Sequence, residues 1–332
     1  MSENNSNTDQ TKQSCKTGVM PRLYLMMFSG GRTSAVLAKH LKSNPDKYPN
    51  VIYVFLNTGK EREETLKFVD KCDKEWNLSV VWLEAIINDG KGNGTTFREV
   101  TFETASRNGE PFEAMLKKYP LPTNFASNCT RELKQRPVED YVRWLKSNIY
   151  KNYEIIRVIG IRADEAHRKS IHAEKEKIIY PLCDEIPFNS KMIRIFWDNQ
   201  SFDLGLKDYE GNCDLCFKKS LKKRLTIIKE NPESAKWWLE MENKYAEYYT
   251  EIEYDTEYIE VEVDGEMITE SVKTNERYVD KRRYFDSRSN IGIEQLVKMA
   301  QQPFTKAQDL HELSQQQCDL FEFETDCFCK AS

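Results

Sequence analysis

Two residue patterns in this chain could do chemistry: closely spaced cysteines, and a glycine-rich turn after an apolar run. Nine cysteines are present. Cys213 and Cys216 form a CxxC pair, and Cys327 and Cys329 form a second close pair. Two thiolates at such spacing can reach one metal ion or iron–sulfur cluster, or act as a redox dithiol. An odd cysteine count without an export signal favours metal binding or thiol chemistry over disulfides.

The glycine-rich turn lies between the apolar run 23–28 and an amphipathic stretch over 33–41, and reads Ser29-Gly30-Gly31-Arg32-Thr33-Ser34. Its two glycines let the backbone turn tightly and bring N–H groups close to an anion. A helix beginning here adds unpaired N–H donors and a partial positive charge. Arg32 can pair with a phosphate or sulfate, and the hydroxyls can donate to it or cap the helix. The spacing fits phosphate binding and a plain capped turn equally well.

Apolar runs that alternate with amphipathic stretches predict the elements that position these residues. The runs cover 23–28, 51–56, 80–83 and 155–159, and helical spacing occurs over 61–76 and 131–147. This alternation predicts an α/β, three-layer, Rossmann-like sandwich with a mostly parallel sheet of about five strands. Ligands of such sheets bind at the carboxyl ends of the strands, where the strand order reverses. Residues 88–96, rich in Gly and Asn, are expected to form a loop.

Composition divides the chain into three parts. Residues 1–20 are polar and are expected to be a disordered arm. Residues 21–230 hold the α/β pattern, and residues 231–332 are expected to be a helical region with a cysteine-containing tail. Residues 245–272 contain no Lys or Arg, and strict alternation over 258–263 precedes Asp264-Gly265. This pattern is typical of a hairpin, here an acidic one over about 250–275.

Charge and hydropathy exclude some classes of protein. The net charge is −5, from 49 basic and 54 acidic residues, which does not suggest a protein that coats nucleic acid, although a local basic patch stays open. No apolar run reaches 18 residues, which excludes a transmembrane helix and a membrane partner. The first twenty residues have no apolar segment typical of a secretory signal, so we expect a cytoplasmic protein.

Four segments, in order, resemble the phosphoadenosine phosphosulfate (PAPS) reductase branch of the PP-loop ATP pyrophosphatases, in the adenine-nucleotide alpha-hydrolase-like superfamily. The glycine turn is similar to the SGGxDS loop of that superfamily. The other three segments are FLNTGKEREET over 55–65, NCTRELK over 128–134 and GIRADEAHR over 160–168. The resemblance covers roughly residues 22–230 and implies a nucleotide-binding α/β domain.

The resemblance implies that an adenine nucleotide (PAPS, APS or ATP) binds at these segments. The residues that match are Ser29, Gly30, Gly31, Arg32, Thr33, Ser34, Phe55, Asn57, Thr58, Gly59, Arg131, Lys134, Gly160, Arg162 and Arg168. Among them, the segment around Phe55 and Thr58 would border the adenine and ribose, and the cationic side chains would bind the anionic groups. Thr33 stands where ATP-cleaving relatives carry an Asp that helps to hold magnesium. The replacement favours chemistry other than adenylation, and Mg²⁺ is expected only if ATP is the substrate.

The resemblance also bears on the cysteines. Adenylyl-sulfate reductases of this branch carry a 4Fe-4S cluster on cysteines at positions similar to Cys129, Cys213 and Cys216, and a fourth ligand would be Cys183 or a tail cysteine. Two alternatives stay open: a structural zinc on Cys213, Cys216, Cys327 and Cys329, and a redox dithiol. The ECGLH-like tail of assimilatory reductases is absent, and Cys327 and Cys329 are the candidate catalytic thiols.

Three functions follow as alternatives. The first is reduction of a phosphosulfate by thiolate attack, with an external dithiol such as thioredoxin as reductant. The second is ATP-dependent adenylation by a sulfurtransferase or nucleobase-modifying enzyme, for which tRNA or DNA stays open as a partner. The third is a non-catalytic nucleotide- or nucleic-acid-binding module with structural zinc. The sequence leaves the oligomeric state open.

Overall fold

A computed structural model describes residues 20–90, 92–123, 126–263, 266–282, 284–285 and 291–309 of the chain. The N-terminal segment 1–20, which the sequence predicts to be disordered, lies outside these residues, apart from Met20. The tail cysteines Cys327 and Cys329, named above as catalytic candidates, also lie outside the described residues.

Six strands form the main sheet, in the order β4-β3-β2-β1-β5-β6. They are β1 (Arg22–Phe28), β2 (Val51–Asn57), β3 (Val81–Ile87), β4 (Thr95–Val100), β5 (Glu154–Ile159) and β6 (Ile178–Ile179). All neighbours pair in parallel except β3 and β4, which are antiparallel. The mostly parallel sheet expected from the sequence is confirmed. The expected loop over 88–96 is shorter than predicted, because Thr95 and Thr96 already pair with β3.

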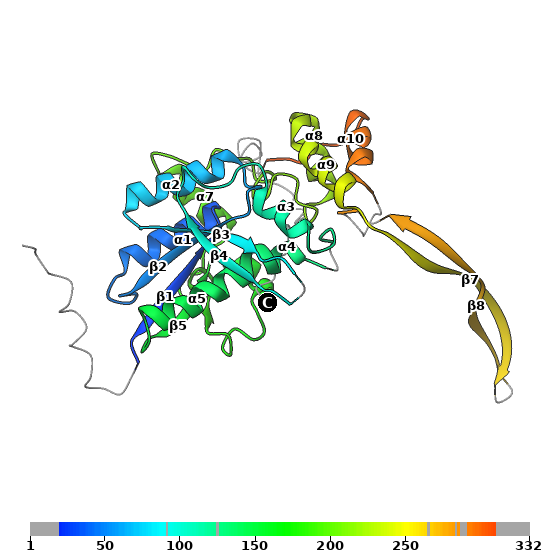
Figure 1. Ribbon diagram of the computed structural model, residues 1–332, viewed down its shortest axis with the longest axis horizontal. Coiled ribbons are helices and arrows are strands. Elements are labelled where there is room, and N and C mark those ends of the chain that lie inside the picture. Colours follow the sequence, from blue (N-terminus) through cyan, green and yellow to red (C-terminus); the bar gives the residue numbers. More distant parts are fainter. Residues whose placement is uncertain are drawn as a thin grey trace, which may run out of the picture.

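Helices cover both faces of the sheet and give it three layers (Figure 1). Along β1 the buried side chains alternate: Tyr24 and Met26 belong to one core cluster, whereas Leu23 and Leu25 belong to another. The first cluster includes side chains of α1 (Arg32–Ser43), α2 (Glu63–Trp76) and α7 (Ser190–Asp198). The second includes side chains of α5 (Arg136–Asn148). The continuous apolar runs of the sequence are therefore strands buried on both faces.

A further core joins the sheet region to helices from the end of the chain. Phe112 and Leu133 pack in one cluster with Phe217, Trp238 and Leu296. The remaining helices are α3 (Glu110–Leu116), α4 (Asn128–Thr130), the π-helix η1 (Arg131–Gln135), the 3-10 helices η2 (Ala163–Arg168) and η3 (Pro232–Ala235), α6 (Pro181–Asp184), α8 (Leu221–Glu230), α9 (Lys236–Tyr245) and α10 (Ile293–Gln301). The cluster thus takes side chains from both sides of residue 230, where the composition changes.

A two-stranded antiparallel hairpin projects from the body of the molecule (Figure 1). Its strands are β7 (Tyr248–Val263) and β8 (Glu266–Arg282), and their register shifts between Glu253 and Asp255. The hairpin overlaps the acidic segment in which the sequence predicts one and is longer than predicted. At its base, Arg282 Nη2 donates to Asn243 Oδ1 at 2.8 Å. We call this element the arm.

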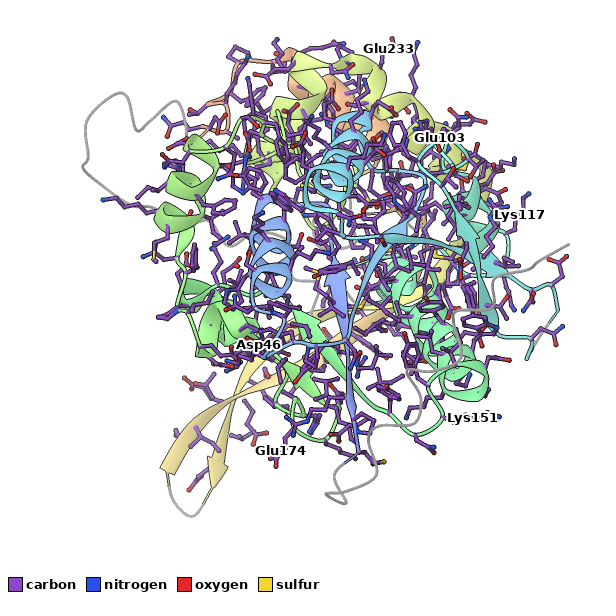
Figure 2. The ribbon with its side chains drawn as sticks, turned by 90° about the vertical axis from the view of Figure 1, so that its left-hand side faces the viewer. Asp46, Glu103, Lys117, Lys151, Glu174 and Glu233 are labelled. Carbon is purple, nitrogen blue, oxygen red and sulfur yellow. The ribbon has the colours of Figure 1, made fainter. Side chains whose placement is uncertain are left out.

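Charged side chains lie around the outside of the body, as Asp46, Lys117, Lys151 and Glu174 do (Figure 2). The sheet and its flanking helices enclose the apolar side chains instead. In the part of the chain that the structure describes, no helix combines the length and the apolar character that crossing a membrane requires.

Candidate functional site

A cavity of about 560 Å³ lies at the carboxyl ends of β1 and β5. The strands β2 and β3 follow on one side of β1 and β5 lies on the other, so the strand order reverses at this point. Loops that leave adjacent strands in opposite directions open a crevice. The cavity brings together ten of the fifteen predicted nucleotide-binding residues: Ser29, Gly30, Gly31, Arg32, Thr33, Ser34, Lys134, Gly160, Arg162 and Arg168.

The turn after β1 depends on Gly30. Its φ is +78°, and a Cβ at this position would lie 2.6 Å from Thr65 Cγ2 and 3.0 Å from Phe55 Cε2. Glycine therefore satisfies both the left-handed backbone and the close approach of α2. Gly31 is the N-cap of α1, and no side chain caps the helix. The first N–H groups of α1 are thus available to an anion in the cavity.

Hydroxyl groups and a second glycine hold the turn against the loop that follows β5. Ser29 Oγ donates to Ser34 Oγ at 2.9 Å, and Ser34 Oγ donates to the Gly31 carbonyl at 2.9 Å. A Cβ at Gly160 would lie 3.3 Å from Ser34 Cα. The two loops therefore pack backbone against backbone, which fixes both walls of the cavity.

Arg32 is held by acidic side chains that the sequence reading missed. Its Nε and Nη2 donate to Asp203 at 2.7 and 2.5 Å, and its Nη1 lies 3.8 Å from Asp208. Burial lowers the pKa of Arg32, but the hydrogen bond and charge of Asp203 outweigh burial and raise it. Burial raises the pKa of Asp203, and Arg32 more than offsets this and lowers it. Arg32 is thus part of an ion pair at the cavity wall.

The cations after β5 are paired as well. Arg162 donates to both carboxylate oxygens of Asp164, at 3.0 and 3.2 Å, and Arg168 donates to Glu165 at 2.5 Å. The Nε–H of Arg168 is buried and donates to no partner among the described residues. Lys134 reaches the same cavity from η1. The lining therefore combines four predicted cations with nearby carboxylates.

Four predicted residues, at the end of β2 and directly after it, do not line the cavity. Phe55 is buried behind Gly30, and Asn57 donates to Glu84 Oε1 at 2.7 Å and to the Ser106 carbonyl at 2.8 Å. Thr58 Oγ1 donates to Glu61, and Gly59 has a φ of +77°. The side chains of Asn57 and Thr58 fix the end of β2, and Leu56, on the opposite face of the strand from Phe55 and Asn57, lines the cavity.

Arg131, also predicted to bind the nucleotide, lines a different hollow. Its Nε donates to Glu132 Oε1 at 2.6 Å, and both residues border a second hollow of about 460 Å³. Lys134, three residues further along η1, borders the first cavity. The π-helix η1 therefore contributes a residue to each hollow: Lys134 to the first and Arg131 to the second.

Sequence reasoning missed one wall of the cavity, formed by residues 190–212. Trp197, Asp203 and Lys207 line it, and Trp197 Nε1 donates to the Arg32 carbonyl at 3.2 Å. This segment carries no local motif and comes from far along the chain. Its aspartates, unlike the glycine turn, could be assigned only from their position in space.

The CxxC loop docks on the segment that follows β2. The Asp214 N–H donates to the Lys60 carbonyl at 3.0 Å, and Lys60 Nζ lies 3.1 Å from Asp214 Oδ2. Trp238 Nε1 donates to Asp214 Oδ1 at 2.7 Å. Gly211 and Asn212, at the start of the loop, border the cavity at the ends of β1 and β5. The loop is therefore fixed by its aspartate and touches the cavity.

Of the cysteines near this loop, Cys213 is buried and Cys129 and Cys216 are half-buried. Burial, with the nearby charge of Glu61, raises the pKa of the Cys213 thiol, and Cys129 and Cys216 pack against the same core cluster. Cys183, considered as a fourth ligand, packs against a separate cluster. Among the described residues, no three Cys, His, Asp or Glu side chains come together as a metal-ion site. The cluster expected on Cys129, Cys213 and Cys216 therefore stays a prediction.

Comparison with known proteins agrees with the geometry of the cavity. The model of the phosphoadenosine phosphosulfate reductase domain matches residues 24–177. The chain is 34% identical over 202 residues to an uncharacterized nin region protein of Escherichia phage lambda, a match that covers 60% of this chain and 67% of that protein.

A second relative is an uncharacterized protein of Methanocaldococcus jannaschii, 26% identical over 248 residues, which are 68% of this chain and 42% of the archaeal protein. The chain thus spans less than half of this second relative. The family match runs from within β1 past the end of β5 and includes both loops of the cavity. The chain belongs to the phosphoadenosine phosphosulfate reductase domain family, within the PP-loop, adenine-nucleotide alpha-hydrolase-like superfamily.

Proposed function

We propose that this chain binds an adenine nucleotide in the cavity at β1 and β5 and reduces a phosphosulfate carried by that nucleotide. The observation that supports this most is the turn at Gly30 and Gly31, which directs the uncapped start of α1 into a cavity with cations. Backbone N–H groups and a helix start suit a phosphate. Apolar side chains of the lining, such as Leu56 and Trp197, suit the base.

The charge of the cavity suits a small anion. Six cationic side chains line it (Arg32, Lys134, Arg162, Arg168, Arg194 and Lys207), against four carboxylates (Glu165, Asp198, Asp203 and Asp208). The excess of two positive charges favours an anionic ligand, and the carboxylates hold several of the cations in place. Lys134 and the N–H groups of the turn would stabilise the phosphate that leaves in the reaction.

The proposed chemistry begins with a thiolate from Cys327 or Cys329. The thiolate attacks the sulfur of the phosphosulfate, the bond from sulfur to the bridging oxygen breaks, and AMP or its 3′-phosphate derivative leaves. A cysteine S-sulfonate results. A thiolate of an external dithiol then attacks the cysteine sulfur, releases sulfite and forms a mixed disulfide. The second thiol of the reductant resolves this disulfide, so that the dithiol is oxidised by two electrons and the cysteine thiol is regenerated.

The position of residue 309 supports a role for the tail thiols. The Ala307 N–H donates to Thr226 Oγ1 at 2.8 Å, and the charge of Asp309 contributes to the raised pKa of Arg32 at the cavity wall. Asp309, at the end of the described residues, therefore lies near Arg32. Cys327 is the eighteenth residue after Asp309, and eighteen fully extended residues span at most roughly 60 Å.

Binding and turnover measurements test the proposal. Calorimetry with adenosine 3′,5′-bisphosphate should show binding that Lys134→Gln and Arg162→Gln each weaken about tenfold, the loss of one charge-assisted contact. Lys146→Gln, an exposed lysine of α5, is the matched control. Sulfite release from PAPS or APS with thioredoxin should be lost in a Cys327→Ser, Cys329→Ser double variant. Sulfite release that persists in this variant contradicts the thiol assignment.

ATP-dependent adenylation is a second candidate, and the acidic wall favours it. Asp203 and Asp208 lie beside the turn in which Thr33 offers no carboxylate, and carboxylates are the ligands that Mg²⁺ requires. Release of pyrophosphate from ATP in the presence of Mg²⁺ would support adenylation and contradict phosphosulfate reduction. Nucleotide binding with one zinc, no iron and no turnover would instead favour a non-catalytic module.

A further inference from the structure

The second hollow, of about 460 Å³, is separate from the nucleotide cavity. Its walls come from the loop between β3 and β4, from η1 and from α5. Three arginines border it: Arg131, Arg136 and Arg143. One acidic side chain, Glu132, shares the lining and is buried. The hollow is therefore a cationic patch on a chain whose net charge is −5.

Two of these arginines have partners that an anion can replace. Arg136 Nη1 lies 3.1 Å from Glu139, and Arg143 Nη2 lies 2.8 Å from Asp140. Each pair joins residues three apart on the exposed surface of α5, and solvent-exposed pairs of this kind contribute little to stability. The guanidinium groups can exchange these partners for a phosphate, which they bind through two parallel hydrogen bonds.

The third arginine is held in place. Glu132 accepts a hydrogen bond from Arg131 Nε at 2.6 Å and also accepts one from Thr95 Oγ1. Thr95 and Arg131 together lower the pKa of Glu132 despite the opposing effect of burial. The guanidinium of Arg131 also lies 5.4 Å above the centre of the Tyr119 ring. An ionised carboxylate and an aromatic ring thus orient Arg131 before any ligand arrives.

The glycine loop leaves room beside the arginines. A Cβ at Gly92 or at Gly94 would meet nothing within 4 Å, so the backbone there is open to a ligand. Lys118 Nζ donates to the carbonyls of Asn88 and Asn93 and fixes the loop at both ends. The hollow therefore combines oriented cations with accessible backbone.

We propose that this second hollow binds the phosphodiester backbone of a single-stranded nucleic acid. Arg136 and Arg143 are seven residues apart in α5, a distance of about 10 Å along the helix axis. This distance lets the two guanidinium groups contact different phosphates of one strand. Tyr119, whose ring lies beneath the Arg131 guanidinium, lines the hollow, and Trp144, which follows Arg143 in α5 but does not line the hollow, is 41% exposed. Cationic side chains combined with aromatic rings are the features that bind single strands without sequence preference.

Fluorescence anisotropy with labelled single-stranded DNA and RNA 20-mers of one sequence tests the proposal. An Arg136→Gln, Arg143→Gln double variant should bind the strands about tenfold more weakly than the wild type. The slope of log affinity against log salt should fall by about 1.4, because each phosphate contact in a single strand contributes about 0.7. Arg22→Gln is the matched control, an exposed arginine paired with Glu154 at the start of β1, and should bind as the wild type does.

Two results would overturn the proposal: neither strand binds the wild type, or the double variant binds the strands as tightly as Arg22→Gln does. In the first case, binding of inorganic phosphate, measured by calorimetry and lost in the double variant, would make the hollow a site for free anions. Arg136 and Arg143 do not line the nucleotide cavity, so unchanged adenine-nucleotide affinity and melting temperature show that the double variant is folded.

Discussion

At Gly30, the absence of a side chain decides whether the turn after β1 can close against α2. Gly30→Ala places a methyl group 2.6 Å from Thr65 Cγ2 in a backbone with a φ of +78°. We expect the free energy of unfolding to fall by roughly 1–3 kcal/mol, because strain and overlap add, and nucleotide affinity to fall with it. Urea denaturation and calorimetry measure the two effects.

Gly94→Ala is the control for this change. A Cβ there meets nothing within 4 Å, and the φ of Gly94 is not in the left-handed range. We expect its free energy of unfolding to stay within about 0.5 kcal/mol of the wild type. If Gly30→Ala is as stable as Gly94→Ala, the turn is not constrained as described.

Asp203 links the glycine turn to the wall formed by residues 190–212, and its effect should depend on pH. The pKa of Asp203 is lower in the folded protein than its ordinary value of 3.8. The stability that it contributes is therefore present above pH 3.8 and is lost as the pH falls through the folded pKa. Asp203→Asn should lower the free energy of unfolding by about 1 kcal/mol at pH 7, since the pair is partly exposed.

The measurement for Asp203 is chemical denaturation of wild type and variant at pH 7, 5 and 3. The difference between them should be constant from pH 7 to 5 and should shrink toward pH 3. A difference that grows in acid would contradict the ion pair with Arg32. Asp198→Asn, a substitution of another carboxylate in the same wall, provides the comparison.

At the scale of the element, the strands could be predicted and the approach of distant loops could not. The strands predicted over 23–28, 51–56 and 155–159 lie within one or two residues of β1, β2 and β5, because buried parallel strands are continuous apolar runs. The edge strand β4 was missed, since its sequence, TTFREV, has only two apolar residues.

The candidate site divides in the same way. The glycine turn and the loop after β5 follow apolar runs directly, so the sequence could assign Gly30, Gly160 and Arg162. Arg131 and Lys134 are near neighbours in sequence, yet the π-helix η1 turns them into different hollows. Residues three apart lie on the same face of an α-helix, so a prediction that assumes an α-helix places both side chains on one side. The π-helix changes this geometry. Asp203 has no motif at all and is identified by its partner, Arg32.

The arm can be removed to test whether the body depends on it. The partners of its two strands are mainly each other, and a two-stranded hairpin adds little core to a protein. We expect replacement of residues 250–280 by a short Gly-Ser linker to change the free energy of unfolding of the body by less than about 1 kcal/mol and to leave nucleotide affinity unchanged. Loss of folding on deletion would show that the arm supports the body. Denaturation and calorimetry provide the two readings.

At the scale of the whole molecule, the C-terminal helices complete a core that the sheet region begins. Trp238 and Leu296 are buried in the same cluster as Phe112 and Leu133. A chain that stops at residue 230 would expose the partners of these side chains. Each large apolar side chain contributes roughly 1.5–3 kcal/mol to stability when it is buried. Losing several of these contributions removes a large part of a typical net stability of about 5–15 kcal/mol.

We therefore expect the fragment 20–230 to lack a cooperative unfolding transition in circular dichroism. The chain from 20 to 309 without the arm, which keeps α9 and α10, should retain one. A fragment 20–230 that melts cooperatively and binds the nucleotide would show that the composition boundary at residue 230 is also a folding boundary.

The charge of the arm gives the molecule an uneven charge distribution, which affects its orientation in an electric field. Its two strands carry ten acidic and four basic residues, so they hold more than the net charge of −5, and the rest of the chain is nearly neutral. Sixteen residues of strand extend about 50 Å, which places this charge far from the centre of mass. The molecule therefore has a permanent dipole moment along the arm. A nearby polyanion repels the arm and attracts the arginines of the second hollow. These two forces produce a torque that orients the protein before contact. The torque acts within the screening length, which is about 8 Å in physiological salt.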